Sequence, residues 1–310
     1  MGFQIESTGV YLPRRIVTNQ ELERKFVYLD RSIEEKVGIK TRRFSSENES
    51  CCNMGLEAAI QALSQSRISL NDIGLIIFGT NTPGEEYYPF HQEFALNLSE
   101  RLKSDFSGEL IFLPGVCTLP LQELKYAERY FLEEGSKDYA LCVAATDQSK
   151  YIDLSDTKTA IIFGDAAHAI LLKKSHKTDN RFLELNDSSG FKAMYYDKDR
   201  KMRMPSGREI YQFVFGHISP FFHELKGSDE IDWYILHQAQ GKMIQGIVER
   251  TGIPEEKMIN NYRIYGNTGC CSIGVGLHEA IQDGRIKRGD KIMLLGFAVG
   301  YHMMGCVLEY

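Results

Sequence analysis

The sequence predicts an α/β fold with mixed or parallel sheets, built from two similar halves. Short, continuously apolar segments alternate along the chain with segments of helical periodicity. Apolar strands separated by helices are typical of sheets that are buried on both faces. The 310 residues, 43% of them hydrophobic, are enough for two domains or for one large domain made of two related units.

In the first half, helices and strands alternate. Residues 56–66 have helical periodicity, and residues 73–80 form a short apolar strand. A second helix is predicted over 118–134, where Gly135 ends it, and a second buried strand over 139–146.

The second half repeats this order. The strand ending at Thr80 matches the strand ending at His237, an offset of 157 residues. A later helix–glycine–strand unit also matches, and that pairing places Cys117 opposite Asn267, 150 residues further on. Such a repeat predicts two halves related by a pseudo-twofold axis, with their sheets packed around shared central helices. The turns at Cys117, His237 and Asn267 would then face one crevice.

The apolar segment 292–308 carries no formal charge and resembles a membrane tail. It is shorter than the roughly 20 residues that a spanning helix needs, and it contains three glycines and His302. We therefore expect two buried strands joined by a glycine-bearing turn, and no membrane anchor.

Composition excludes several classes of function. The net charge is −6 and no basic stripe interleaves with aromatic residues, so nucleic acid is not expected as a partner. The seven cysteines include no C-x-x-C, and no apolar leader begins the chain, which predicts a reducing, cytoplasmic location. No cluster of cysteine and histidine has the spacing of a metal site, so no metal is expected.

Cys117 is the candidate nucleophile. It follows an apolar strand and precedes a helix whose first turn contains Thr118 and Pro120. Unpaired N–H groups and the helix dipole at such a position lower the pKa of a thiol. The alternative is a buried cysteine that acts as a small hydrophobic residue, as we expect for Cys142 and Cys306.

His237 and Asn267 are candidates for hydrogen bonding to a substrate. His237 ends a strand, where a neutral imidazole can serve in acid–base chemistry or bind a carbonyl group. Asn267 lies between two glycines before a helix, so its amide could donate into a site. The alternatives are a structural histidine and an ordinary turn asparagine.

The order of Cys117, His237 and Asn267, together with the motifs around them, resembles the thiolase-fold condensing enzymes. The most similar family is β-ketoacyl-acyl-carrier-protein synthase III. Seven motifs in the family's order carry this resemblance: STGVYLPRRIVTNQEL, VGIKTRRF, TAIIFGDAAHAILL, MPSGREIYQF, HQAQ, YGNTGCCS and LLGFAVG.

The resemblance implies a thiolase-like fold with αβαβα layers. Residues 1–165 would form the half that carries the nucleophilic cysteine, and residues 166–310 the half that carries the histidine and asparagine. It also implies a homodimer, with a heteromeric pairing as the alternative.

The resemblance also implies a mechanism without a bound cofactor. Cys117 would accept an acyl group from a thioester of coenzyme A or acyl carrier protein. His237 and Asn267 would stabilise the enolate that forms when a malonyl thioester loses CO2. The backbone N–H of Cys117 and that of Val299 or Gly300 would form the oxyanion hole.

The side that would bind coenzyme A departs from the family pattern. Ser32 stands where many members have a tryptophan that stacks on adenine, and Lys36 and Lys242 replace two phosphate-binding arginines. Lysine lacks the bidentate fork of arginine, and serine cannot stack. We therefore expect weaker use of free coenzyme A and greater reliance on donors bound to carrier protein.

Three aromatic residues align with the loop that, in this family, reaches across a dimer and shapes the acyl pocket. They are Tyr87, Tyr88 and Phe90. They would narrow that pocket or offer a phenol to a substrate. The alternative is ordinary core packing.

The sequence therefore favours a condensing enzyme of the synthase III type, in a specialised fatty-acid or secondary-metabolite pathway. One alternative is a related acyltransferase that moves the acyl group from Cys117 without condensation. The other is a non-catalytic partner subunit of a synthase heteromer, and the presence of Cys117 argues against it.

Overall fold

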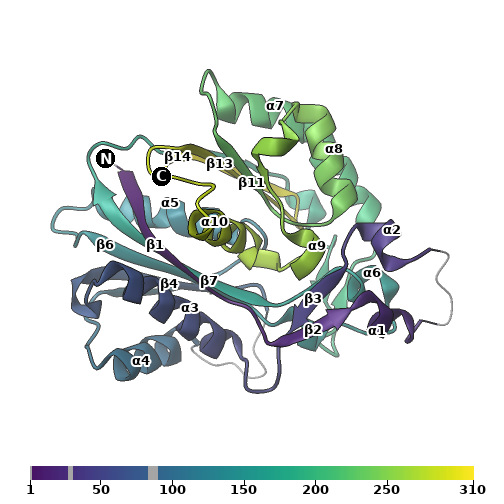
Figure 1. The fold of residues 1–310 in the computed structure, drawn as a ribbon, viewed down its shortest axis with the longest axis horizontal. Helices are drawn as coiled ribbons and strands as arrows, with labels where there is room; N and C mark the ends of the chain where they lie inside the picture. Colours follow the sequence, from purple (N-terminus) through teal and green to yellow (C-terminus); the bar gives the residue numbers. More distant parts are fainter. Residues whose placement is uncertain (1, 27–30, 83–89) are drawn as a thin grey trace.

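The protein is built in layers that alternate helix, sheet, helix, sheet and helix (Figure 1). The computed structural model describes residues 2–26, 31–82 and 90–310. The layering confirms the predicted α/β class and the αβαβα arrangement.

The first sheet has five strands in the order β1–β7–β6–β4–β5. They are β1 (Gly2–Tyr11), β4 (Ile73–Thr80), β5 (Glu109–Pro114), β6 (Tyr139–Thr146) and β7 (Ala166–Ser175). β4 runs parallel to β5 and β6, whereas β7 runs antiparallel to β6 and β1. The strands predicted at 73–80 and 139–146 are β4 and β6, and helices cover both faces of this part of the sheet.

The second sheet repeats the first, strand for strand. Its order is β12–β11–β13–β14–β8. Its strands are β8 (Arg181–Asn186), β11 (Trp233–Leu236), β12 (Met258–Ile259), β13 (Lys291–Ala298) and β14 (His302–Glu309). β11 runs parallel to β12 and β13, and β14 runs antiparallel to β13 and β8. Thus β4, β5, β6, β7 and β1 correspond to β11, β12, β13, β14 and β8, which confirms the predicted duplication.

The boundary between the two halves lies later than expected. The sequence placed it between residues 165 and 166, but β7 pairs with β1 and β6 in the first sheet. The chain enters the second sheet only at β8. β6 and β7 are antiparallel neighbours in the same way as β13 and β14, so a boundary before β7 divides a strand pair that the other half keeps together.

The apolar segment 292–308 forms most of β13 and β14, as predicted. The turn between them contains Gly300, whose φ of +84° is a conformation that glycine adopts without strain. Within the described ranges, no helix has both the length and the apolar character needed to cross a bilayer.

Helices fill the outer and central layers (Figure 1). α3 (Cys51–Ser66) and α4 (Phe90–Leu102) cover the first sheet, α7 (Gly207–Lys226) and α8 (Gly241–Thr251) cover the second, and α5 (Leu119–Leu132) and α10 (Ser272–Gln282) lie between them. α3 begins earlier than predicted because Ser50 caps it, its side chain accepting the N–H of Asn53.

Shorter elements complete the chain at the edges of the layers. They are β2 (Arg15–Thr18), α1 (Asn19–Glu23), α2 (Ile33–Val37), β3 (Thr41–Phe44), α6 (Thr157–Ala160), β9 (Tyr195–Tyr196), β10 (Met202–Arg203) and α9 (Tyr262–Tyr265). β2 pairs with β3, and β9 pairs with β10.

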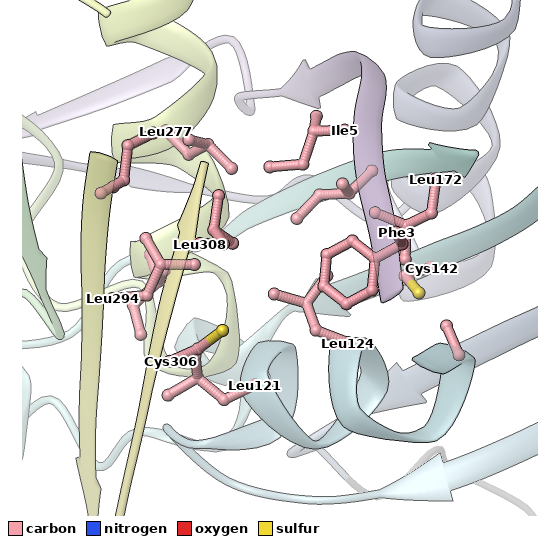
Figure 2. Close-up of a cluster of buried hydrophobic side chains, with 14 of the residues drawn as sticks. Phe3, Ile5, Leu121, Leu124, Cys142, Leu172, Leu277, Leu294, Cys306 and Leu308 are labelled. Atoms are coloured by element: carbon pink, nitrogen blue, oxygen red, sulfur yellow. The ribbon is translucent and has the colours of Figure 1, made fainter. Parts of the chain in front are cut away.

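The central core joins the two sheets around α5 and α10 (Figure 2). Phe3 of β1, Leu124 of α5, Leu277 of α10 and Leu294 of β13 are all essentially inaccessible to solvent. Cys142 and Cys306 lie in the same core, as the sequence predicted. Other members labelled in Figure 2 are Ile5, Leu121, Leu172 and Leu308. Because this core is close-packed, it fixes where the two central helices begin.

One ionisable pair interrupts the central layer. Glu123 of α5 and His168 of β7 are fully buried, and the Glu123 Oε2 and His168 Nε2 atoms are 3.9 Å apart. Neither side chain has a hydrogen-bond partner among the described residues. Burial raises the pKa of Glu123 well above its usual value and lowers the pKa of His168 to about 3. Both side chains are therefore uncharged at neutral pH.

We predict that Glu123→Gln removes a pH dependence of stability. Because the pKa of Glu123 is raised in the folded protein, its carboxyl ionises at a lower pH in the unfolded chain than in the folded protein. The folded protein therefore loses stability as the pH rises above about 4.5, the usual pKa of glutamate. Relative to the wild type, the unfolding free energy of the Gln variant should increase by about 1.4 kcal/mol per pH unit, as long as Glu123 of the folded wild type stays protonated. Urea unfolding at pH 6 and pH 8 measures this difference.

The exposed Glu134, just beyond the end of α5, provides the matched control. Glu134→Gln should show no such trend. A constant difference between Glu123→Gln and the wild type at both pH values would contradict the assignment of a protonated Glu123.

Candidate active site

A cavity of about 80 Å³ lies where the ends of strands and helices from both halves meet. Cys117, His237 and Asn267 all line it. They come from the loop before α5, the end of β11 and the loop before α10. The structure therefore brings together the three side chains that the sequence singled out, and their catalytic roles remain predictions.

Cys117 lies immediately before the N-cap residue of α5 and is 8% exposed. Burial, and to a smaller extent the neighbouring Cys270, raise the pKa of its thiol to about 12, although the backbone N–H of Cys117 acts to lower it. The prediction of a lowered thiol pKa is therefore wrong. The loss of hydration of the thiolate outweighs the nearby N–H groups of the helix terminus.

His237 is a neutral imidazole held by Ser272. Burial lowers the pKa of His237 to about 3. Its Nδ1 is 2.7 Å from the Oγ of Ser272, which also accepts the N–H of Gln238. With that acceptor position occupied, the Ser272 hydroxyl can donate to Nδ1, which leaves the ring proton on Nε2. His237 can then donate a hydrogen bond from Nε2.

Asn267 is held at both its main chain and its side chain. Its N–H donates to the carbonyl of Ile162 at 2.9 Å, and its carbonyl accepts Gly164 N–H at 3.0 Å and Gln148 Nε2 at 2.7 Å. Its Oδ1 accepts the N–H of Gly269 at 2.9 Å. The oxygen end of the amide is thus engaged within the loop, and the NH2 end is the one that can donate to a substrate.

The predicted oxyanion donors lie beside the same cavity. Val299 lines it, and Gly300 follows in the turn between β13 and β14. Within the described chain, the N–H groups of Cys117, Val299 and Gly300 donate to no backbone carbonyl. Their role as donors to a negatively charged oxygen stays a prediction.

Much of the remaining wall is apolar and was not predicted residue by residue. It includes Met194, Met204, Tyr211, Gln240, Met243 and Phe297. Met204 and Tyr211 belong to the MPSGREIYQF motif, and Gln240 ends the HQAQ motif. Membership in these motifs was the signal that could have identified them.

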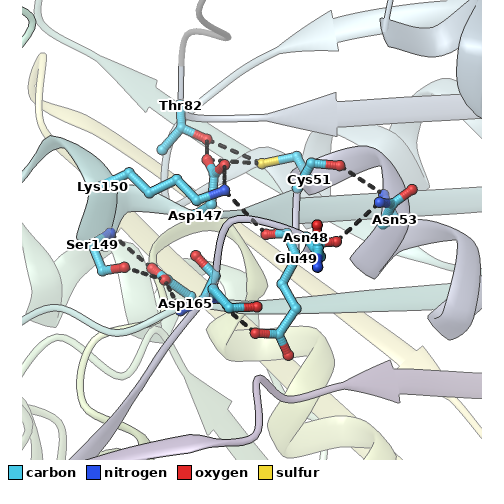
Figure 3. A network of polar contacts seen from close by, with 12 residues as sticks. Asn48, Glu49, Cys51, Asn53, Thr82, Asp147, Ser149, Lys150 and Asp165 are labelled. Carbon is cyan, nitrogen blue, oxygen red and sulfur yellow. Dashed lines mark hydrogen bonds and ion pairs between the residues drawn. The ribbon is translucent and has the colours of Figure 1, made fainter.

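The structure does not place Phe90 with Cys117. Phe90 begins α4 and lines a separate polar cavity with Cys51, Thr82 and Asp147. There the Cys51 thiol donates to Asp147 Oδ1 at 3.1 Å, as Figure 3 shows. Burial raises the pKa of Cys51 well above its usual value, so this thiol stays protonated. Tyr87 and Tyr88 lie outside the described residues.

The two predicted phosphate-binding lysines lie on α2 and α8 and are not among the residues that line the cavity. Lys36 lies in the last turn of α2. Lys242 follows the first residue of α8 and lines a groove with Glu34, Glu35 and Glu255. Glu34 is itself paired with Arg263 at 3.0 Å and with Lys40 at 3.6 Å, so this groove carries charges of both signs.

Ser32 has a structural function at the start of α2. Its Oγ accepts the N–H of Glu35, and the Glu35 carboxylate accepts the N–H of Ser32. This reciprocal pair is a capping box, which stabilises the first turn of the helix. Weaker binding of coenzyme A, because Ser32 cannot stack on its adenine ring, stays a prediction.

Across the ranges 2–26, 31–82 and 90–310, no group of three histidine, cysteine, aspartate or glutamate side chains could hold a metal ion. All seven cysteines are free and buried. The functional groups that line the cavity include the thiol of Cys117, the imidazole of His237 and the amide of Asn267.

Comparison with known proteins identifies the family. The family model described as "3-Oxoacyl-[acyl-carrier-protein (ACP)] synthase III" matches residues 114–189, and the family model of the C-terminal part of the same enzymes matches residues 224–310. A β-ketoacyl-[acyl-carrier-protein] synthase III from Porphyra purpurea is 32% identical over the full length of both chains. This chain belongs to the β-ketoacyl-acyl-carrier-protein synthase III family.

Solved structures agree with this family. The synthase III from Aquifex aeolicus superposes with a TM-score of 0.90 at 31% identity, and all of both chains is covered. The priming β-ketosynthase of the R1128 polyketide pathway has a TM-score of 0.88 at 23% identity, covering 99% of this chain and 96% of that one. The second likeness shows the shared thiolase fold alone.

We predict that Cys117 reacts slowly with iodoacetamide at neutral pH and faster as the pH rises. A thiol pKa of about 12 means that the thiolate fraction increases about tenfold per pH unit below that value. The logarithm of the alkylation rate should therefore rise linearly between pH 6.5 and pH 9.5. Peptide mass spectrometry resolves Cys117 from the other buried cysteines, and a plateau below pH 9 would contradict the raised pKa.

Proposed function

We propose that the protein catalyses a decarboxylative Claisen condensation between an acyl group carried on Cys117 and a malonyl thioester. The observation that supports this most strongly is the cavity itself. It joins a buried thiol, a neutral imidazole and an amide whose NH2 end can donate. Family membership supports the same reaction class, and the acyl transfer to Cys117 makes the enzyme an acyltransferase.

The first step loads the enzyme. The Cys117 sulfur attacks the carbonyl of the donor thioester, and the bond to the donor's thiol sulfur breaks. The proton of Cys117 passes to the departing thiolate, because burial disfavours a free thiolate at this position. The N–H groups of Cys117 and Val299 stabilise the tetrahedral oxyanion.

The second step forms the carbon–carbon bond. The malonyl thioester carbonyl accepts hydrogen bonds from His237 Nε2 and the Asn267 amide. These two donors stabilise the enolate left when CO2 departs, and its carbon attacks the acyl group on Cys117. The Cys117 sulfur leaves as a thiolate and takes up a proton.

We further propose that carrier-protein thioesters load Cys117 better than coenzyme A thioesters. Ser32 cannot stack on an adenine ring, and Lys36 and Lys242 lack the bidentate fork with which arginine binds a phosphate group, so the recognition of a free nucleotide is weaker. These departures also favour a specialised pathway over general fatty-acid initiation.

We predict that acyl carrier protein carrying a short acyl chain adds one acyl mass to the wild type and none to Cys117→Ser. The acylation rate from the carrier protein should exceed that from the same acyl group on coenzyme A by about tenfold, a difference of about 1.4 kcal/mol. Intact-protein mass spectrometry over time measures both rates. Equal rates would contradict the carrier preference, and no acylation from any donor would contradict the enzymatic proposal.

We predict that Asn267→Asp separates the two steps. The substitution keeps the size of the side chain but replaces its NH2 donor by an acceptor oxygen, so the enolate loses a hydrogen bond. Release of CO2 from malonyl carrier protein should fall at least about 100-fold, while loading of Cys117 stays within a few-fold.

Asn53→Asp, an exposed site in α3, is the matched control and should change neither rate. Loading without any CO2 release in the wild type would instead support an acyltransferase that does not condense.

A further inference from the structure

A chain of hydrogen bonds connects the residue after Cys117 to the protein surface. Thr118 Oγ1 is 2.8 Å from His302 Nδ1, and His302 Nε2 is 3.0 Å from Glu184 Oε1. Lys125 Nζ donates to Glu184 Oε2 at 2.7 Å. Four residues from α5, β8 and β14 are thereby joined in one path.

The direction of these bonds follows from the charge of Glu184. Its hydrogen bond from Lys125 lowers the pKa of Glu184, and the bond from His302 lowers it further, so the group is a carboxylate that only accepts. His302 must then donate from Nε2. In the neutral imidazole, Nδ1 accepts, and the Thr118 hydroxyl is the donor.

This path connects the two segments that supply the oxyanion donors. Thr118 is the N-cap residue of α5, next to Cys117, yet its side chain makes no capping bond to the helix. His302 begins β14 and pairs with Ala298 across the turn that contains Val299. The Thr118 hydroxyl is therefore used to join the first half of the chain to the second at this turn.

The backbone around Thr118 is seated closely on β13. A Cβ atom at Gly296 would lie 3.1 Å from Thr118 Cγ2 and 3.3 Å from Thr118 Cα. Glycine at this position lets the start of α5 approach the strand that leads into the turn. The close approach and the hydrogen bond act on the same pair of segments.

A hydroxyl, an imidazole and a carboxylate in series resemble a catalytic triad. Thr118, however, is fully buried, and it is not among the residues that line the cavity around Cys117. A substrate carbonyl cannot reach its oxygen. The arrangement therefore serves to position other groups.

We propose that Thr118, His302 and Glu184 are positioning residues that hold the two N–H donors of the oxyanion hole at a fixed separation. This inference rests on the proposed function, because it concerns the tetrahedral oxyanion formed during loading. A displacement of one donor by about 1 Å can cost about 100-fold in rate. Loss of the Thr118–His302 bond should therefore lower the rate of acyl transfer to Cys117 more than it changes the intrinsic reactivity of the Cys117 thiol.

The test compares two reactions of Cys117 in Thr118→Val, which keeps the branched shape and removes the hydroxyl. Acylation by acyl carrier protein passes through an oxyanion, whereas alkylation by iodoacetamide does not. We expect kcat for acylation to fall about 10- to 100-fold with KM nearly unchanged. The alkylation rate at the same pH should stay within about twofold, since that reaction does not use the donors.

Three further variants complete the test. Thr118→Ser retains a hydroxyl and should restore most of the acylation rate. Thr251→Val removes another buried hydroxyl, one that donates to Ile247 within α8, and should leave both rates unchanged. Glu184→Gln, at a half-exposed position, should lower acylation by a few-fold and provides a folded variant if Thr118→Val is unstable.

The outcomes separate this inference from the proposed function. Acylation of Thr118→Val at the wild-type rate, with the wild type active, would overturn the positioning network alone. A parallel fall of acylation and alkylation would also overturn it, because the thiol rather than the donors would then have changed. A wild type that no donor acylates would overturn the proposed function and this inference together.

Discussion

The site depends on the burial of α5 and α10 between two sheets. Each helix packs apolar side chains against both sheets, so neither can shift along its axis without opening the core. Their N-terminal loops carry Cys117 and Asn267, and His237 follows β11 of the adjacent sheet. The duplication therefore has a chemical consequence. Equivalent loops of two similar halves meet at one cavity, and each half contributes side chains that the other lacks.

The same burial sets the protonation states in the central layer. Loss of hydration keeps the Cys117 thiol and the Glu123 carboxyl protonated and keeps His237 and His168 neutral. A neutral His237 can still donate a hydrogen bond from Nε2, which is the role proposed for it toward the enolate. In the proposed reaction, Cys117 must lose its proton as its sulfur attacks, because burial disfavours a free thiolate.

Hydrogen bonds join the two halves beside the cavity. The loop of Asn267 bonds to the backbone of Ile162 and Gly164 before β7. Thr118, next to Cys117, bonds to His302, which follows the turn that contains Val299. Both connections cross from one half to the other, so the geometry of the site is a property of their docking. Polar contacts of this kind hold an orientation that apolar packing alone would leave less defined.

The sequence by itself determined the fold class, the duplication and the three central residues. Continuous apolar strands such as 73–80 and the repeated order of elements are local signals that survive without tertiary information. The motifs around Cys117, His237 and Asn267 were sufficient for the family. Tertiary structure alone decided the thiol pKa, the boundary after β7, and the partnerships of Thr118 with His302 and Glu123 with His168. The physical reason is that desolvation and hydrogen bonding between distant segments depend on which surfaces meet, and spacing along the chain does not encode this.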